Sequence, residues 1–177
     1  AAGVMGLKMN AEAALSGVRV LAAEPLEKRR AEALAFGADQ AIAAEDWLEA
    51  AKAWAGPAGI DAVILTIGNP DLVAPCIKAC RPGGRVVLFA GFGNRPTATV
   101  DLNDIHYREI VLVGSEWIGT PPNQRRDRYD QARDRLIEGK APFDRLVTAR
   151  CGFDDLEQAL QRRQSFENLK TMFLTER

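Results

Sequence analysis

Apolar runs of strand length recur along this chain, and between them apolar residues repeat at helical spacing. The segments Ile60–Ile67, Val86–Ala90 and Ile110–Val113 are apolar on nearly every residue instead of on alternate ones. Consecutive apolar residues are typical of parallel strands that are covered on both faces. Because such strands alternate with helical patterns throughout, we predict an α/β fold with a parallel sheet and right-handed crossovers.

The same pattern predicts the remaining elements. Helices are expected over residues 5–16, 25–36, 46–54, 70–80, 123–138 and 154–163, and further strands over 18–23, 38–42, 146–148 and 170–174. Asp46 is expected to cap the third helix, and Arg81-Pro82-Gly83-Gly84 to end the fourth. No repeat or linker interrupts the 177 residues, so we predict one domain over 1–177 and no second domain in this chain.

The first six residues, Ala1-Ala2-Gly3-Val4-Met5-Gly6, resemble a glycine-rich dinucleotide-binding turn without its preceding strand. Gly3 would let the backbone approach a pyrophosphate, and Gly6 would let the following helix pack closely on the sheet. Glu24 ends the next apolar run, about twenty residues on. A carboxylate there accepts hydrogen bonds from a ribose diol and repels a 2′-phosphate, which favours NAD over NADP. An alanine-rich helix that follows an ordinary glycine turn is the alternative.

Composition narrows the functional classes. The net charge is −1 and basic runs are mixed with acids, which argues against nucleic acid or an anionic membrane as a partner. No signal peptide or spanning run is present, so a cytoplasmic location is the default expectation. Three cysteines do not suggest a disulfide framework. Cys76 and Cys80 share one face of a predicted helix. Together with Cys151 and the single histidine, His106, they are candidates for a metal site. Buried free thiols are the simpler interpretation of these cysteines, and we favour it.

Several short motifs, in their order and spacing, resemble the zinc-dependent medium-chain alcohol and polyol dehydrogenases, the group of sorbitol and threonine dehydrogenases. The resemblance covers the coenzyme-binding domain and C-terminal part of such enzymes and implies a Rossmann-type doubly wound parallel sheet. It rests on the glycine turn, Glu24 with Arg29, Phe36-Gly37-Ala38-Asp39, Gly59-Ile60-Asp61, Thr66-Ile67-Gly68-Asn69-Pro70, Arg81-Pro82-Gly83-Gly84-Arg85-Val86-Val87 and Ile105-His106-Tyr107-Arg108-Glu109.

This resemblance implies a set of cofactor-binding residues. Met5 would lie under the nicotinamide side, Glu24 and Arg29 would hold the adenosine ribose, and Lys170 would reach the pyrophosphate. The residues expected around the nicotinamide and its ribose are Thr66, Ile67, Gly68, Ala90, Gly91, Phe92, Ser115, Glu116 and Trp117. Simpler roles remain open: strand-end core residues for Thr66, Ile67 and Ala90, a solvated helix charge for Arg29, loop packing for Trp117, and a turn residue for His106.

The resemblance also implies the chemistry, in which zinc acts as a Lewis acid on an alcohol and hydride passes to NAD. In such enzymes the zinc ligands come from a catalytic domain before the glycine turn. We therefore expect neither catalytic nor metal-binding residues in this chain, which alone would be inactive. We further expect that the chain is a piece of a longer enzyme and that the absent first strand leaves a gap in the sheet centre.

Two other functions remain open at this point. One is a non-catalytic dinucleotide-binding or dimerisation module, and the other is a zinc-free quinone reductase relative, whose usual preference for NADPH conflicts with Glu24. In the resembled family the strand that matches Ile110–Val113 pairs across a dimer twofold. A homodimer or homotetramer through that edge is therefore expected, with a small alcohol as the substrate.

Overall fold

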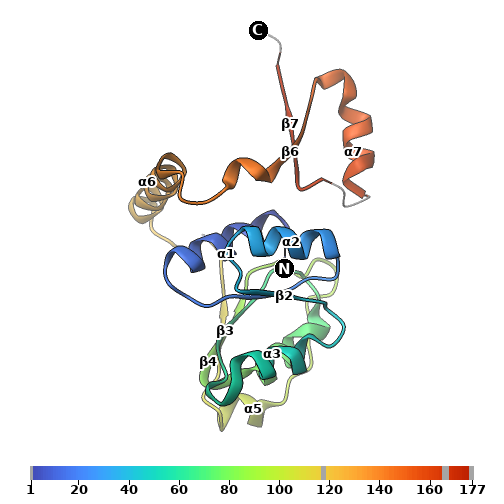
Figure 1. Ribbon diagram of the computed structural model, residues 1–177. Helices are drawn as coiled ribbons and strands as arrows, with labels where there is room; N and C mark the ends of the chain where they lie inside the picture. The colour runs from blue at the N-terminus through green and yellow to red at the C-terminus, as the bar shows by residue number, and fades with distance from the viewer. Residues whose placement is uncertain (1, 117–118, 165–167, 176–177) are drawn as a thin grey trace.

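The computed structural model describes residues 2–116, 119–164 and 168–175 (Figure 1). Its strands are β1 Leu21–Ala23, β2 Gln40–Ile42, β3 Ile60–Leu65, β4 Cys80–Leu88, β5 Val111–Gly114, β6 Val147–Cys151 and β7 Lys170–Phe173. Its α-helices are α1 Val4–Leu15, α2 Glu27–Ala35, α3 Trp47–Ala55, α4 Val73–Ala79, α5 Leu102–His106, α6 Pro122–Glu138 and α7 Leu156–Gln164. Short 3₁₀ helices are η1 Gly56–Ala58, η2 Pro70–Leu72, η3 Phe143–Leu146 and η4 Phe153–Asp155.

All strand pairs are parallel, which confirms the predicted α/β class. The strands form three sheets, ordered β1-β2, β3-β4-β5 and β6-β7. Within the described residues no ladder joins β1 to β3, so the Rossmann-like sheet is divided at the position where a central strand was expected to be absent. The carboxyl ends of the remaining strands precede the turns that carry the candidate site residues.

Two hydrophobic clusters stabilise the two halves of this divided sheet. The first joins Leu7 of α1 and Phe36, next to α2, to Ala22 of β1, and it also includes Leu146 of η3. The second joins Ile77 of α4 to Leu65 of β3 and Val86 of β4. Phe36, Leu7, Ile77 and Val86 are the largest fully buried side chains. Each half therefore has its own core, and helices α1, α2 and α4 supply most of it.

The expectation that β3 is covered on both faces is wrong. Val63 and Leu65 point into the second cluster, whereas Ile64 is 45% exposed. Side chains alternate along a strand, and the cluster around α4 covers only one of the two faces. The strand β5 is likewise exposed along its length. Consecutive apolar residues thus identified the strands but overstated their burial.

Three local predictions are also corrected. The fourth helix ends at Ala79, so Cys80 begins β4 and is not a helix residue. Arg81 to Gly84 lie inside β4, where Gly83 takes a left-handed φ of 72° and the β3–β4 register shifts. Asp46 occupies the N-cap position of α3, but its side chain accepts no capping hydrogen bond. At this end of α4 the Arg108 guanidinium donates to the carbonyls of Ile77 and Cys80 and so supplies partners for groups that a helix end leaves unpaired.

Several of the family-like motifs stabilise the fold away from the candidate site. The Asp61 carboxylate lies 2.6 Å from Arg81 Nε, and a Cβ at Gly59 would lie 2.8 Å from the Cβ of Arg81. At the start of β1, Asp39 Oδ2 accepts a hydrogen bond of 2.7 Å from the amide of Val20. These contacts hold the amino-terminal ends of the strands, opposite to the edge where parallel α/β sheets bind ligands.

The C-terminal arm, defined here as residues 142–173, extends away from the helices α1 and α2 (Figure 1). It contains η3, β6, η4, α7 and β7, and the rings of Phe153 and Phe173 stack within it at 5.8 Å. Leu146 and Leu169 join the arm to the first cluster. Among the residues that the structure describes, no helix is both long and apolar enough to cross a membrane.

Candidate cofactor-binding site

The helix α1 begins at Val4, directly after a glycine. Gly3 is the N-cap residue, with φ −73° and ψ 174°, and it has no side chain that could make a capping hydrogen bond. The first turn holds no acidic residue, and a Cβ at Gly3 would meet no atom within 4 Å. The amide groups and positive dipole end of a 12-residue helix are therefore available to an anion. Gly6 is buried against the fold, and Met5 beside it is 47% exposed.

Glu24 is bonded directly to this turn. Its Oε2 accepts a hydrogen bond of 2.8 Å from the Ala2 amide, and its Oε1 accepts one of 3.3 Å from Leu26. Burial, which leaves the residue 4% exposed, by itself raises the carboxyl pKa, but the hydrogen bonds from Ala2 and Leu26 contribute to a net shift below 4.5. The side chain is thus a carboxylate at neutral pH.

Arg30 stabilises the backbone around Glu24 through two hydrogen bonds. Its Nη1 donates to the carbonyl of Glu24 at 2.9 Å and to that of Pro25 at 2.7 Å. The family resemblance implied a role for Arg29, five residues after Glu24, and did not point to Arg30. A basic residue in the first turn or two of a helix after a strand-ending acid is the signal that could have found it. The ribose role of Arg29 stays a prediction.

The turns after β3 and β4 touch each other at two glycines. A Cβ on Gly68 would lie 2.0 Å from the carbonyl oxygen of Gly91 and 3.2 Å from the Cα of Phe92. The amides of Phe89 and Ala90 both donate to the carbonyl of Leu65, at 3.2 and 3.1 Å. The predicted nicotinamide residues Thr66, Ile67, Gly68, Ala90, Gly91 and Phe92 are therefore brought together, and the backbone of their turns forms the contact.

The segment after β5 joins the same edge. The Ser115 amide donates to the carbonyl of Leu88 at 3.1 Å, which places Ser115 and Glu116 beside the end of β4. Both residues are exposed. Trp117 lies outside the described residues. Two of the three predicted residues of this segment therefore lie at the carboxyl edge of the sheet, where the switch-point rule expects a ligand.

Lys170 comes from the C-terminal arm. It is exposed and begins β7, where it pairs with Val147 of β6. Its neighbour Leu169 packs against the first cluster, which contains Ala2 of the glycine turn. Lys170 therefore follows directly on a residue that packs against the same cluster as the turn, although 168 positions separate it from Ala2 in the sequence. The structure describes no contact between the Lys170 ammonium group and the turn.

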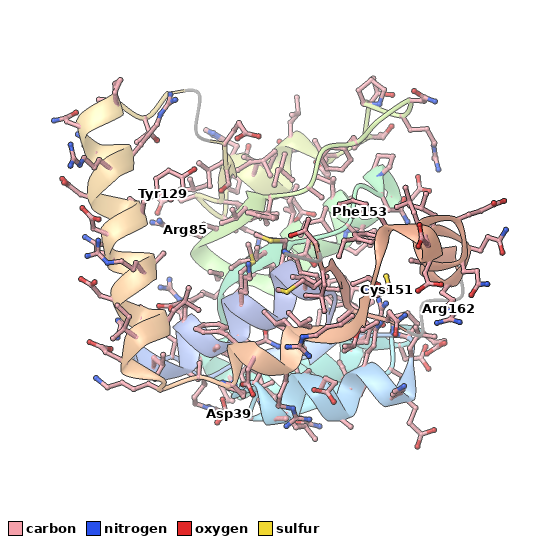
Figure 2. All side chains as sticks on the ribbon, turned by 90° about the horizontal axis from the view of Figure 1, so that it is seen from above. Asp39, Arg85, Tyr129, Cys151, Phe153 and Arg162 are labelled. Carbon is pink, nitrogen blue, oxygen red and sulfur yellow. The ribbon has the colours of Figure 1, made fainter. Side chains whose placement is uncertain are left out.

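The described residues do not fit a zinc ion, because no three of their His, Cys, Asp or Glu side chains cluster as ligands would. Cys76 and Cys80 are free and buried, and desolvation raises the pKa of Cys76 to about 12 and also raises that of Cys80. Cys151 lies in the C-terminal arm (Figure 2), and His106 is exposed beside Tyr107 at the end of α5.

Comparisons with known proteins identify relatives of this chain. The family profile described as "Zinc-binding dehydrogenase" matches residues 4–137. An L-threonine 3-dehydrogenase of Thermococcus kodakarensis is 28% identical over 97% of this chain and 49% of its own length. A geraniol dehydrogenase of Castellaniella defragrans is 30% identical over 91% of this chain and 43% of its own. The chain thus spans about half the length of these curated relatives.

Solved structures show the same fold. An alcohol dehydrogenase zinc-binding domain protein from Burkholderia ambifaria superposes on all of this chain and 47% of its own, with a TM-score of 0.85 and 23% identity. A zinc-binding dehydrogenase from Sinorhizobium meliloti, solved with NADP, covers 98% of this chain and 50% of its own (TM-score 0.82, 25% identity). An alcohol dehydrogenase from E. coli, solved with NADH, covers 97% and 49% (TM-score 0.80, 21% identity). From the match over residues 4–137, the chain belongs to the zinc-binding dehydrogenase family and has its Rossmann-like fold.

Proposed function

We propose that this chain binds NAD as the coenzyme-binding part of a dehydrogenase that transfers hydride from a secondary alcohol. The observation that carries the proposal is the bonding of Glu24 to the Ala2 amide, which joins the ribose-binding carboxylate and the glycine turn into one unit. A carboxylate held there by backbone amides can accept hydrogen bonds from the hydroxyl groups of an adenosine ribose, and it repels a 2′-phosphate. This geometry supports NAD over NADP, although relatives with either cofactor are known.

The positions of the other candidate residues suggest where the pyrophosphate and the nicotinamide of NAD would bind. The first-turn amides of α1 would bind the pyrophosphate, with Lys170 as its cationic partner. The touching turns at Gly68 and Gly91 would receive the nicotinamide and its ribose against backbone atoms, with Met5 on one side. When bound, NAD supplies the ring carbon that accepts the hydride. The chain's own contribution is to orient that ring and to exclude water from one of its faces.

The alcohol and the zinc belong to the whole protein. A polyol, a cyclitol or a hydroxy amino acid is the substrate class we propose, and similarity to an L-threonine 3-dehydrogenase supports it. We place the zinc with ligands outside these residues, because no three His, Cys, Asp or Glu side chains cluster as ligands among the residues that the structure describes. A zinc-free quinone reductase that uses NADPH is less compatible with the Glu24 carboxylate. A dinucleotide-binding module without catalysis would keep the same cofactor contacts and lose only the reaction.

Titration calorimetry with NADH and NADPH on the full-length protein tests the cofactor proposal. Glu24→Gln keeps the side-chain size but removes the charge, so NADH binding should weaken about tenfold while discrimination against NADPH falls. Glu27→Gln is the matched control, because Glu27 is exposed in the first turn of α2 and contacts none of the predicted cofactor groups. An unchanged ratio of NADH to NADPH affinity in Glu24→Gln would reject the ribose assignment. Turnover of an alcohol panel then separates an enzyme from a binding module.

We also propose that two copies pair through β5. Val111, Leu112 and Val113 are exposed on this strand, and β4 is the one strand that pairs with it among the described residues. An exposed apolar edge strand is a template for pairing with another chain. Leu112→Lys should shift the sedimentation velocity profile from dimer or tetramer to monomer, whereas Leu102→Lys, at a leucine of α5 that is more exposed than Leu112, should not. Unchanged sedimentation of Leu112→Lys would reject this interface.

A further inference from the structure

The position of Lys170 is set by the neighbouring strand β6. Val147 begins β6 and pairs with Lys170 at the start of β7. The next residue, Thr148, supplies a hydroxyl oxygen that accepts the Leu169 amide at 2.9 Å and donates to the Lys170 carbonyl at 3.4 Å. The backbone on both sides of Lys170 is therefore fixed by β6. Any contact that sets the start of β6 also sets the position of Lys170.

An ion pair sets the start of β6. Arg145 Nη2 lies 2.9 Å from Glu32 Oε1, and 113 sequence positions separate the two residues. Arg145 stands two residues before Val147, and Leu146 between them is buried in the first cluster with Ala2 and Leu7. The ion pair and the buried leucine together attach the C-terminal arm to α2 and α1. Figure 1 shows this end of the arm directly above those two helices.

Glu32 is suited to this attachment because part of it is removed from water. Its side chain is 26% exposed, and its second carboxylate oxygen, Oε2, is buried without a hydrogen-bond partner among the described residues. A partly desolvated carboxylate interacts more strongly with its one cation than a fully exposed carboxylate does. The exposed pair of Arg133 with Asp130 and Asp134 on α6 is, by comparison, local to a single helix.

We propose that the Glu32–Arg145 ion pair positions Lys170 for the pyrophosphate of NAD, so that Arg145 is a positioning residue for cofactor affinity. This inference rests on the proposed function, since it needs the cofactor at the glycine turn. It adds a contribution from residues that do not themselves bind the cofactor. The ion pair between Glu32 of α2 and Arg145 would determine where the ammonium group of Lys170 lies. Removing either member of the pair should act on the phosphates and leave the adenosine end unaffected.

The test compares ADP-ribose with adenosine as probes in titrations of the full-length protein. Lys170→Ala should weaken ADP-ribose about tenfold, Arg145→Ala about three- to tenfold, and the double variant no more than Lys170→Ala alone. Adenosine lacks the pyrophosphate, so its affinity should stay within about twofold in all three variants. The two single variants should also lower the salt dependence of ADP-ribose binding by similar amounts. Arg133→Ala, which removes the same charge from α6, is the matched control and should bind both probes as the wild type does.

Each contrary result has a distinct meaning. If Arg145→Ala weakens adenosine as much as ADP-ribose, the ion pair supports the fold in general and the positioning role is wrong. Additive effects of Arg145→Ala and Lys170→Ala would show that Arg145 does not act through Lys170. Full ADP-ribose affinity in Lys170→Ala would reject Lys170 as the phosphate partner. Failure of the wild-type protein to bind ADP-ribose at all would instead overturn the proposed function, and this inference with it.

Discussion

Replacing Gly68 by alanine is the most direct perturbation of the candidate site. The added Cβ would lie 2.0 Å from the carbonyl oxygen of Gly91, whereas real Cβ atoms essentially never come closer than 3.0 Å to such an atom. The turns after β3 and β4 must therefore separate by about 1 Å, the difference between these two distances. The obstacle is backbone, which cannot rotate away as the end of a long side chain can. Overpacking of this kind costs about 2–3 kcal/mol of unfolding free energy.

That loss corresponds to a melting temperature lower by about 5–10 °C for a domain of this size, measured by circular dichroism or calorimetry. Gly91→Ala is the matched control, because a Cβ there would meet no atom within 4 Å, and its stability should stay within about 0.5 kcal/mol of wild type. NADH affinity should also fall in Gly68→Ala, since Gly91 and Phe92 are displaced. Equal melting temperatures for the two variants would refute the close approach of the turns.

The remaining predictions concern one titrating group, two thiols and the core. The folded pKa of Glu24 lies below 4.5, so the contribution of its carboxylate to stability is fully present above about pH 4.5 and is lost as the pH falls through the folded value. The difference in unfolding free energy between the wild type and Glu24→Gln should therefore shrink between pH 7 and pH 3, as measured in acid denaturation curves. With its pKa raised to about 12, Cys76 should resist iodoacetamide at pH 8 in the native protein while Cys151, which is only partly buried, reacts, and peptide mass spectrometry showing equal labelling would contradict this. Ile77→Ala, at a side chain 1% exposed, should cost about 2–5 kcal/mol in urea unfolding, and a loss below 1 kcal/mol would show that α4 is not packed as described.

The elements of this fold could be predicted from local patterns, because helix and strand periodicities depend on residues a few positions apart. The predicted helices and strands, including β6 and β7, occur in the predicted order, but the short helix α5 was not predicted. Burial was predicted less well, as Ile64 shows, since it depends on which faces other elements cover. The hydrogen bonds at the end of α4 could not be predicted either, because their donor, Arg108, lies 29 residues after Ala79 in the sequence.

For the candidate site, the sequence by itself determined which residue types follow each strand: glycines at 3, 6, 68 and 91, and an acid at 24. Only the tertiary structure decided how they meet. The Ala2 amide donates a hydrogen bond to Glu24, and the turn at Gly68 packs against Gly91. Glu32 forms an ion pair with Arg145 of the C-terminal arm, which also contains Lys170. The physical reason is that periodicity and turn propensity are encoded over a few residues. Hydrogen bonds, close backbone approaches and ion pairs across 22 to 113 positions depend on how the packed elements are placed in space.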